Sequence, residues 1–305
     1  MIRLARVEVL RFVSRRLTQV LTVLVLVAIA VTGVIVAVRS EGPSAAQYRD
    51  ARTERAANVR ACAKHPTDYR VQAQPGETPQ QACDRQIGPV SDWVPDERFD
   101  LRDLGNIFLG TSFLLAAIGL IVGASFVGAE WHWGTVATLL TWESRRTRVI
   151  LVKAFVCVVT VFVLLLGLQL VFGVVLWLDA VTRGITEGTD AAWLRSVTGH
   201  VVRAAALGSF AAAVGLAIAT VGRNTAAALG AGAVYFGVVE GLVRALRPSW
   251  QRWLIGDNAV LFRTGTDNRY PPLDRSTTSS GLVLLAYSVV LVATAVAWFR
   301  ARDLT

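Results

Sequence analysis

Long uncharged apolar runs constrain the fold of this chain more than any other feature. Leu17–Val38 contains 22 residues without a charge, and Leu104–Ala129 contains 26. A helix of about 20 apolar residues is long enough to cross the hydrocarbon core of a bilayer. Of the 305 residues, 53% are hydrophobic and 17% are charged, and the charges lie mainly between the apolar runs. We therefore predict an all-α integral membrane protein.

Six apolar runs define the predicted topology. Transmembrane helices are expected at residues 17–38, 104–129, 150–178, 204–221, 225–243 and 282–299. The fifth is the weakest, because only 16 uncharged residues precede Glu240. The first is too long for the usual secretory signal, and no convincing cleavage site follows it, so we expect a retained anchor. An even number of spans places both termini on the same side.

Arginines at the ends of the spans predict the orientation. Five basic residues precede the first span, three lie in the segment 129–149, and Arg300 and Arg302 follow the last span. Because short cytoplasmic segments are enriched in basic residues, both termini and residues 130–148 are expected in the cytoplasm. Residues 39–103, 179–203 and 244–281 are then expected outside.

The N-terminal residues 1–16 are compatible with an amphipathic helix lying in the membrane surface. Its apolar face includes Phe12, and Arg3, Arg11 and Arg15 lie opposite, where they would meet lipid phosphates. A simple basic flank to the first span is an equally good interpretation.

Two external segments have a character of their own. Residues 39–103 carry 10 basic and 11 acidic residues and form a small insert between spans 1 and 2. Cys62 and Cys83 lie in it, and an oxidising exterior makes a disulfide plausible, with two free thiols as the alternative. The segment 244–281 contains aromatic and aliphatic residues suited to a re-entrant helix before span 6, or else to a surface loop.

The sequence contains few groups that could perform chemistry. Gln169 is the one strongly polar side chain deep in a predicted span, which argues against an ion-coupled pathway through buried charges. No nucleotide-binding loop, hydrolase motif or metal-ligand spacing occurs, and no basic face for nucleic acid remains outside the spans. We expect no catalytic residue, metal or cofactor in this chain.

Small residues recur at four-residue spacing in several spans, as at Gly119–Gly123 and Ala204–Gly208–Ala212. Such spacing lets helices approach closely in lipid. It indicates a packed bundle or a dimer interface.

The stretch 125–153 is unlike the rest of the chain. Glu130 is the first charge after a long apolar run, and an aromatic, helix-compatible segment and three arginines follow it. Trp133, Val136 and Leu140 share one face at helical spacing. These residues alone indicate either a surface for a partner or an interfacial elbow resting on the membrane.

This stretch resembles the first cytoplasmic loop of type-2 ABC exporter permeases. The matching residues are Glu130, Gly134, Thr135, Arg146 and Lys153. The six-span layout, the N-terminal amphipathic helix and the re-entrant segment are also similar to that family, and the arginine-rich composition is similar to that of high-GC bacteria. The insert 39–103 is longer than in minimal members.

The resemblance implies a permease subunit of an ATP-driven exporter in a bacterial plasma membrane. Residues 130–140 would be a coupling helix that docks on a separate ATP-binding subunit. Contacts to that subunit are expected from Glu130, Trp131, Trp133, Gly134, Thr135, Leu139, Arg145 and Arg146. Two ATP-binding subunits, which hold ATP and Mg, would pair with a homodimer or heterodimer of permeases and move an amphipathic drug, lipid or peptide.

Two other functions stay open from the sequence. The chain could be an ion-coupled secondary transporter, since neutral oxygens can also bind sodium. It could also be a membrane receptor or scaffold that presents the insert 39–103 without transporting anything.

Overall fold

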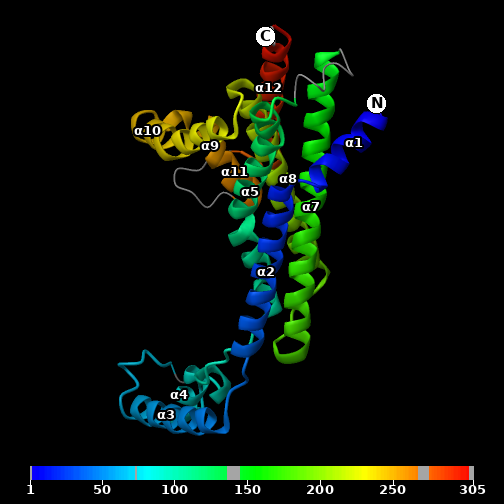
Figure 1. The fold of residues 1–305 in the computed structure, drawn as a ribbon. Coiled ribbons are helices and arrows are strands. Elements are labelled where there is room, and N and C mark those ends of the chain that lie inside the picture. The colour runs from blue at the N-terminus through cyan, green and yellow to red at the C-terminus, as the bar shows by residue number, and fades with distance from the viewer. Residues whose placement is uncertain (1, 73, 136–144, 267–274, 302–305) are drawn as a thin grey trace. The chain divides into compact units, whose positions relative to one another are not determined.

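The computed structural model describes residues 2–72, 74–135, 145–266 and 275–301, and these residues are almost all helical (Figure 1). The α-helices are α1 (Ile2–Val13), α2 (Arg16–Arg39), α3 (Ala45–Lys64), α4 (Pro79–Ile87), α5 (Leu104–His132), α7 (Arg146–Arg183), α8 (Ala191–Gly222), α9 (Thr225–Val234), α10 (Glu240–Leu246), α11 (Ile255–Thr264) and α12 (Thr277–Ala301). The shorter elements are η1 (Val90–Trp93), η2 (Leu101–Asp103), η3 (Tyr235–Val239) and η4 (Pro248–Trp253). The described residues include no β-strand, which confirms the predicted all-α fold.

Six helical segments are long and apolar enough to cross a membrane, as predicted. They are Arg16–Arg39, Leu101–Trp131, Thr147–Arg183, Ala191–Gly222, Thr225–Leu246 and Thr277–Ala301. The fourth begins 13 residues before the apolar run from which it was predicted. Its start is fixed by Asp190, whose carboxylate accepts a hydrogen bond from the Trp193 backbone N–H and so caps α8.

The chain divides into two compact units. The larger consists of Met1–Ala30, Arg102–Val175 and Gly188–Thr305, and the smaller of Val31–Leu101 and Leu176–Glu187. The main apolar core of the larger unit lies among α1, α5, α7 and α8, with Phe12, Phe126, Cys157, Leu165 and Leu216 among its most buried side chains.

Backbone contact between α5 and α8 determines how closely this unit packs. A Cβ atom on Gly119 would overlap the Gly208 carbonyl, and one on Gly123 would overlap the Ala212 carbonyl. The two helices therefore meet where both have small residues, as the four-residue spacing indicated. Within the chain, these residues belong to an intramolecular bundle contact.

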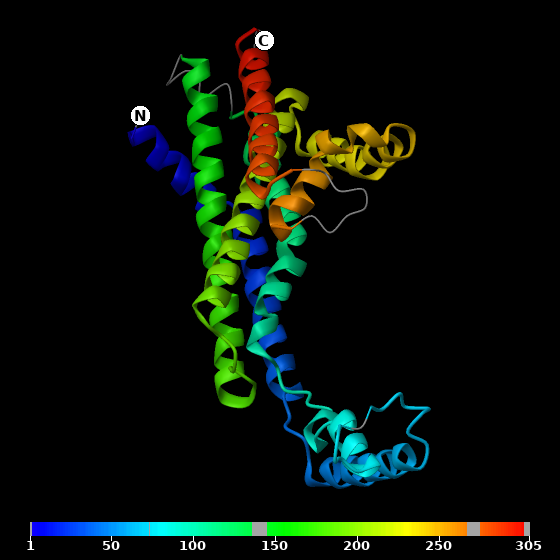
Figure 2. The same ribbon diagram turned by 180° about the vertical axis from the view of Figure 1, so that it is seen from behind.

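The fifth candidate span forms an arm with the elements after it. Helices α9 and α10 are joined by the π-helical turn η3, and their axes cross those of α5 and α8 in Figures 1 and 2. The chain then turns back through η4 into α11. Buried Glu240 connects the two sides of this turn, because its carboxylate accepts hydrogen bonds from the Gly256 N–H at 2.6 Å and from Arg244 at 2.6 Å.

The smaller unit contains most of the predicted external insert. Its helices α3 and α4 both begin with a capping box, formed by Ser44 with Gln47 and by Thr78 with Gln81. The structure joins Cys62 to Cys83 in a disulfide between these helices, and both cysteines are fully buried. Surface ion pairs surround this small core, and the Arg85 guanidinium holds the pKa of Glu77 below its usual range through a side-chain hydrogen bond.

The α5–α8 contact gives a first prediction. Gly119→Ala should lower the free energy of unfolding by about 1–3 kcal/mol, because the added methyl group has no space beside the Gly208 backbone. The measurement is thermal unfolding of the purified protein in detergent. Gly110→Ala on the same helix is the control: open space surrounds it, so it should stabilise by about 0.5–1 kcal/mol. Equal effects of the two changes would contradict the backbone contact.

The disulfide gives a second prediction. Replacing Cys62 and Cys83 together by alanine should destabilise the smaller unit by about 3 kcal/mol, since the bridge closes a loop over a sequence separation of 21. Hydrogen exchange should then quicken in α3 and α4 and stay unchanged in α8. Cys157→Ala, in the core of the larger unit, should leave exchange in α3 and α4 as it was. Unchanged exchange after loss of the cysteine pair would refute the prediction.

Candidate functional site

The predicted coupling segment begins inside a transmembrane helix. Helix α5 continues through His132, so that Glu130 and Trp131 lie in its last turn. Gly134 follows with a φ of +64°, a left-handed conformation that glycine adopts without strain, and it ends the helix. The Thr135 hydroxyl donates a hydrogen bond back to the Glu130 carbonyl at 3.4 Å. The conformation at Gly134 explains why a glycine stands four residues after Glu130.

A buried group of charges joins this helix end to two other segments. The Lys153 ammonium of α7 donates hydrogen bonds to Glu130 Oε1 and to Glu8 Oε2, each at 2.7 Å. Arg15, between α1 and α2, donates to Glu130 Oε1 at 3.2 Å and to the Ser125 carbonyl at 2.6 Å. We call Glu8, Arg15, Glu130 and Lys153 the charge cluster.

Three members of the charge cluster are buried, and the side chain of the fourth, Arg15, is 19% exposed. Lys153 is 2% exposed, Glu8 1% and Glu130 9%. Burying a single ion costs several kcal/mol, which only close partners and further hydrogen bonds can offset. Here two carboxylates face one ammonium and one guanidinium, so the formal charge sums to zero. Burial lowers the pKa of Arg15, yet an arginine still keeps its proton at neutral pH.

Aromatic rings cover the cations of the charge cluster. Arg15 Cζ and Lys153 Nζ each lie 4.8 Å from the centroid of the Phe126 ring. The Phe12 ring packs edge-on against Phe126, with centroids 5.4 Å apart. A ring face attracts cations, and this attraction is strongest where water is excluded. Phe12 and Phe126 therefore bind α1 to α5 at the level of the ions.

The two tryptophans of the coupling segment have different surroundings. Trp131 packs against Phe299 of α12, with centroids 6.0 Å apart, and Arg223 lies over its ring at 5.1 Å. Trp133, beyond the helix end, has 76% of its surface exposed. Trp131 therefore holds helices of the bundle together, while most of the Trp133 surface is exposed.

The other residues predicted for this site are placed as follows. Arg145, Gly134 and Thr135 are exposed, and Arg11 forms a half-exposed ion pair with Glu8 at 3.2 Å. Phe12 is buried on α1 together with Glu8, and Arg15, just after α1, belongs to the charge cluster. Leu139 lies outside the described residues, as do the side chains of Arg3 and Arg146.

Sequence reasoning overlooked Glu8 and the partners of Lys153. Glu8 lies four residues before Phe12, on the same face of α1, and it is the one acidic residue in that segment. Lys153 is one of two lysines in the chain, and it lies near the start of the apolar run 150–178. The available signal was a single acid among the arginines of residues 1–16 and a single lysine among apolar residues. No group of three potential metal ligands occurs in the described part of the chain.

The charge cluster gives a third prediction. Lys153→Met should lower the free energy of unfolding by about 3 kcal/mol, because it leaves the Glu8 and Glu130 carboxylates buried without their shared ammonium. Detergent-solubilised protein serves for the unfolding measurement. The double variant Glu8→Gln with Lys153→Met should cost less than the sum of the two single changes. Arg11→Gln removes the exposed partner of Glu8 and should cost about 0–1 kcal/mol. Additive single effects would show that the cluster does not act as a unit.

Comparison with known proteins identifies the family of this chain. A search of the curated proteins found no match to this chain. The family model described as ABC-2 family transporter protein matches residues 2–245, a range that includes α1 and the whole charge cluster. Members of this family are transmembrane components that generally work with a separate ATP-binding subunit. The match covers most of the chain and agrees with the six apolar helices, so this multi-pass membrane protein belongs to the ABC-2 transporter family.

Proposed function

We propose that this chain is the permease subunit of an ATP-driven exporter and that separate ATP-binding subunits drive it through residues 130–148. The charge cluster is the observation that carries the proposal. It connects the last turn of α5 to α1 and α7 through buried ion pairs of 2.7 Å. A displacement of the coupling segment would therefore be transmitted through these ion pairs to both α1 and α7.

The proposed complex contains two permease chains, identical or different, and two ATP-binding subunits that hold ATP and Mg. Both termini and the coupling segment face the cytoplasm of a bacterial plasma membrane in this proposal, where ATP is available. The family relationship supports an amphipathic substrate, such as a drug, a lipid or a peptide. The long apolar helices, open to lipid on much of their surface, suit a substrate that enters from the membrane.

The residues of the coupling segment would have separate tasks. Exposed Trp133 would contact the ATP-binding subunit, together with Thr135 and Arg145. Glu130 would act inside the chain, since its carboxylate is bonded to Lys153 and Arg15. Trp131 would pass motion to α12 through Phe299.

A fourth prediction separates contact from transmission. Trp133→Ala should reduce co-purification of the ATP-binding subunit at least tenfold, because a large exposed aromatic is a typical centre of binding energy. Its Tm should stay that of the unchanged chain. Trp131→Ala should instead lower the Tm, since it removes contacts within the bundle.

The matched control is Trp250→Ala, which removes a tryptophan of similar exposure (61%) from η4. It should leave both co-purification and ATP hydrolysis unchanged. The experiment expresses the full chain with candidate ATP-binding subunits of ABC transporters and measures the recovered subunit and its ATPase rate. If Trp133→Ala and Trp250→Ala retain the ATPase equally, the proposed docking surface is wrong.

A further inference from the structure

A pocket between α8, α11 and α12 lies apart from the charge cluster. Its volume is about 440 Å³, within the range of pockets that hold small molecules. The lining comes from Arg203, Phe210, Phe262, Thr277, Thr278, Gly281, Leu282 and Leu285. Thr278, Leu282 and Leu285 are exposed, so the pocket opens on the surface of the larger unit.

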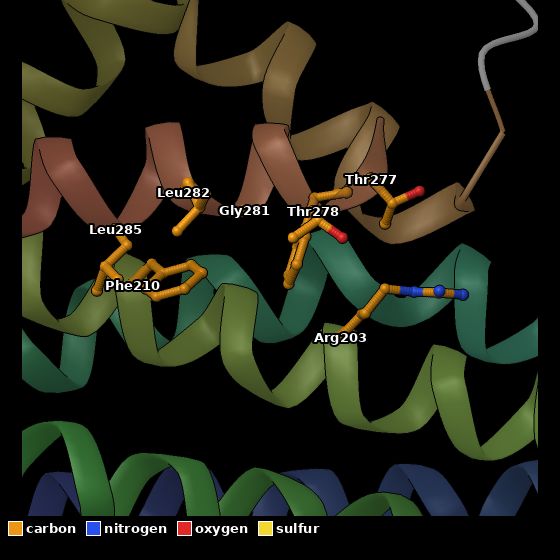
Figure 3. A pocket seen from close by; sticks show the side chains of 8 residues that line it. Arg203, Phe210, Thr277, Thr278, Gly281, Leu282 and Leu285 are labelled. Carbon is orange, nitrogen blue, oxygen red and sulfur yellow. The ribbon is translucent and has the colours of Figure 1, made fainter. Parts of the chain in front are cut away.

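The two ends of the pocket differ in chemistry. Figure 3 shows Arg203 at one end, beside Thr277 and Thr278 in the first turn of α12. Phe210, Leu282 and Leu285 lie toward the other end. Ser276 already caps the first turn of α12, since its hydroxyl accepts a hydrogen bond from the Ser279 N–H, so Arg203 is the charged group at this end. One end of the pocket is therefore cationic and the other is apolar.

Arg203 lacks a counter-ion among the described residues. Its Nε–H is buried without an acceptor, and no described carboxylate lies within ion-pair distance of its guanidinium. The nearby arginines are already engaged: Arg263 donates to the Leu109 carbonyl and to Ser112 Oγ, and Arg275 stacks on Trp253. Among the described residues, Arg203 is thus a partly exposed cation without a carboxylate partner at the polar end of the pocket.

The position of Arg203 along α8 fits a membrane boundary. The 32 residues of α8 span about 48 Å, which exceeds a hydrocarbon core of about 30 Å. Arg203 lies 19 residues before the end of α8 at Gly222, or about 29 Å. If Gly222 lies at one face of the hydrocarbon core, Arg203 lies at the opposite face, at the level of the lipid headgroups.

We propose that this pocket binds a membrane lipid with an anionic headgroup. The headgroup phosphate accepts hydrogen bonds from Arg203, and an acyl chain lies along Phe210, Leu282 and Leu285. The proposal requires only that the chain span a membrane. It is therefore independent of the ATP-binding subunit, and failure of one leaves the other standing.

Native mass spectrometry of the full chain in detergent tests the proposal. The probes are a phosphatidylglycerol and a phosphatidylcholine with identical acyl chains. The unchanged chain should bind phosphatidylglycerol about tenfold more tightly, and Arg203→Gln should abolish that preference, since a charge-assisted hydrogen bond is lost. Arg203→Lys, which keeps the charge, should retain most of it. Arg195→Gln removes an exposed arginine of the same helix and should change nothing.

A second variant tests the apolar end without touching the cation. Leu285→Trp fills the pocket and should weaken binding of both lipids at least tenfold while the Tm is maintained. Inorganic phosphate in excess should fail to displace phosphatidylglycerol, because it cannot use the apolar end. The proposal is overturned if Arg203→Gln keeps the preference, if Leu285→Trp binds as before, or if phosphate displaces the lipid.

Discussion

The structure of the larger unit depends on one lysine placed between two carboxylates. Lys153 Nζ lies 2.7 Å from both Glu8 and Glu130, in surroundings that exclude water. None of these ions would be stable there alone, because each would lose its hydration without an ion pair or hydrogen bond to offset the cost. Their burial is possible only when α1, α5 and α7 all bring their side chains to the same place. The charge cluster therefore favours one arrangement of the three helices, because in any other arrangement these ions would have to stay in contact with water.

This condition bears on how α1 is held. The side chains of Val7, Val9, Leu10 and Val13 are exposed, as suits a helix in contact with lipid. Its inner face is narrow and carries Glu8 and Phe12, so few apolar contacts fix it to the bundle. Electrostatic and aromatic contacts supply the remainder, through Lys153 and Phe126. A helix held mainly at one charged point can pivot there without separating.

The spans were predictable from the sequence because their signal is local. A run of uncharged residues long enough to cross a bilayer is visible without any knowledge of packing, and all six runs became helices. Helix α8 extends beyond the predicted span because the cap at Asp190 starts it before Arg195, His200 and Arg203, which interrupt the apolar pattern.

Contacts between distant segments were much less predictable. Glu130 was identified as a site residue from its neighbours, but its partners are 115 and 23 residues away along the chain. Glu8 was passed over because one acid among arginines looks like an ordinary surface residue. A disulfide between Cys62 and Cys83 was one of two predicted states, because only two cysteines lie in the insert, and the structure contains the bridge.

The glycine contact between α5 and α8 has a mechanical consequence. Where backbone touches backbone, no side chain lies between the two helices that a change of rotamer could move aside. Gly119 against Gly208 and Gly123 against Ala212 leave nothing to rearrange. We therefore expect α5 and α8 to move together as one rigid pair. Motion of α7 and α12 relative to this pair should occur where they contact it through larger side chains.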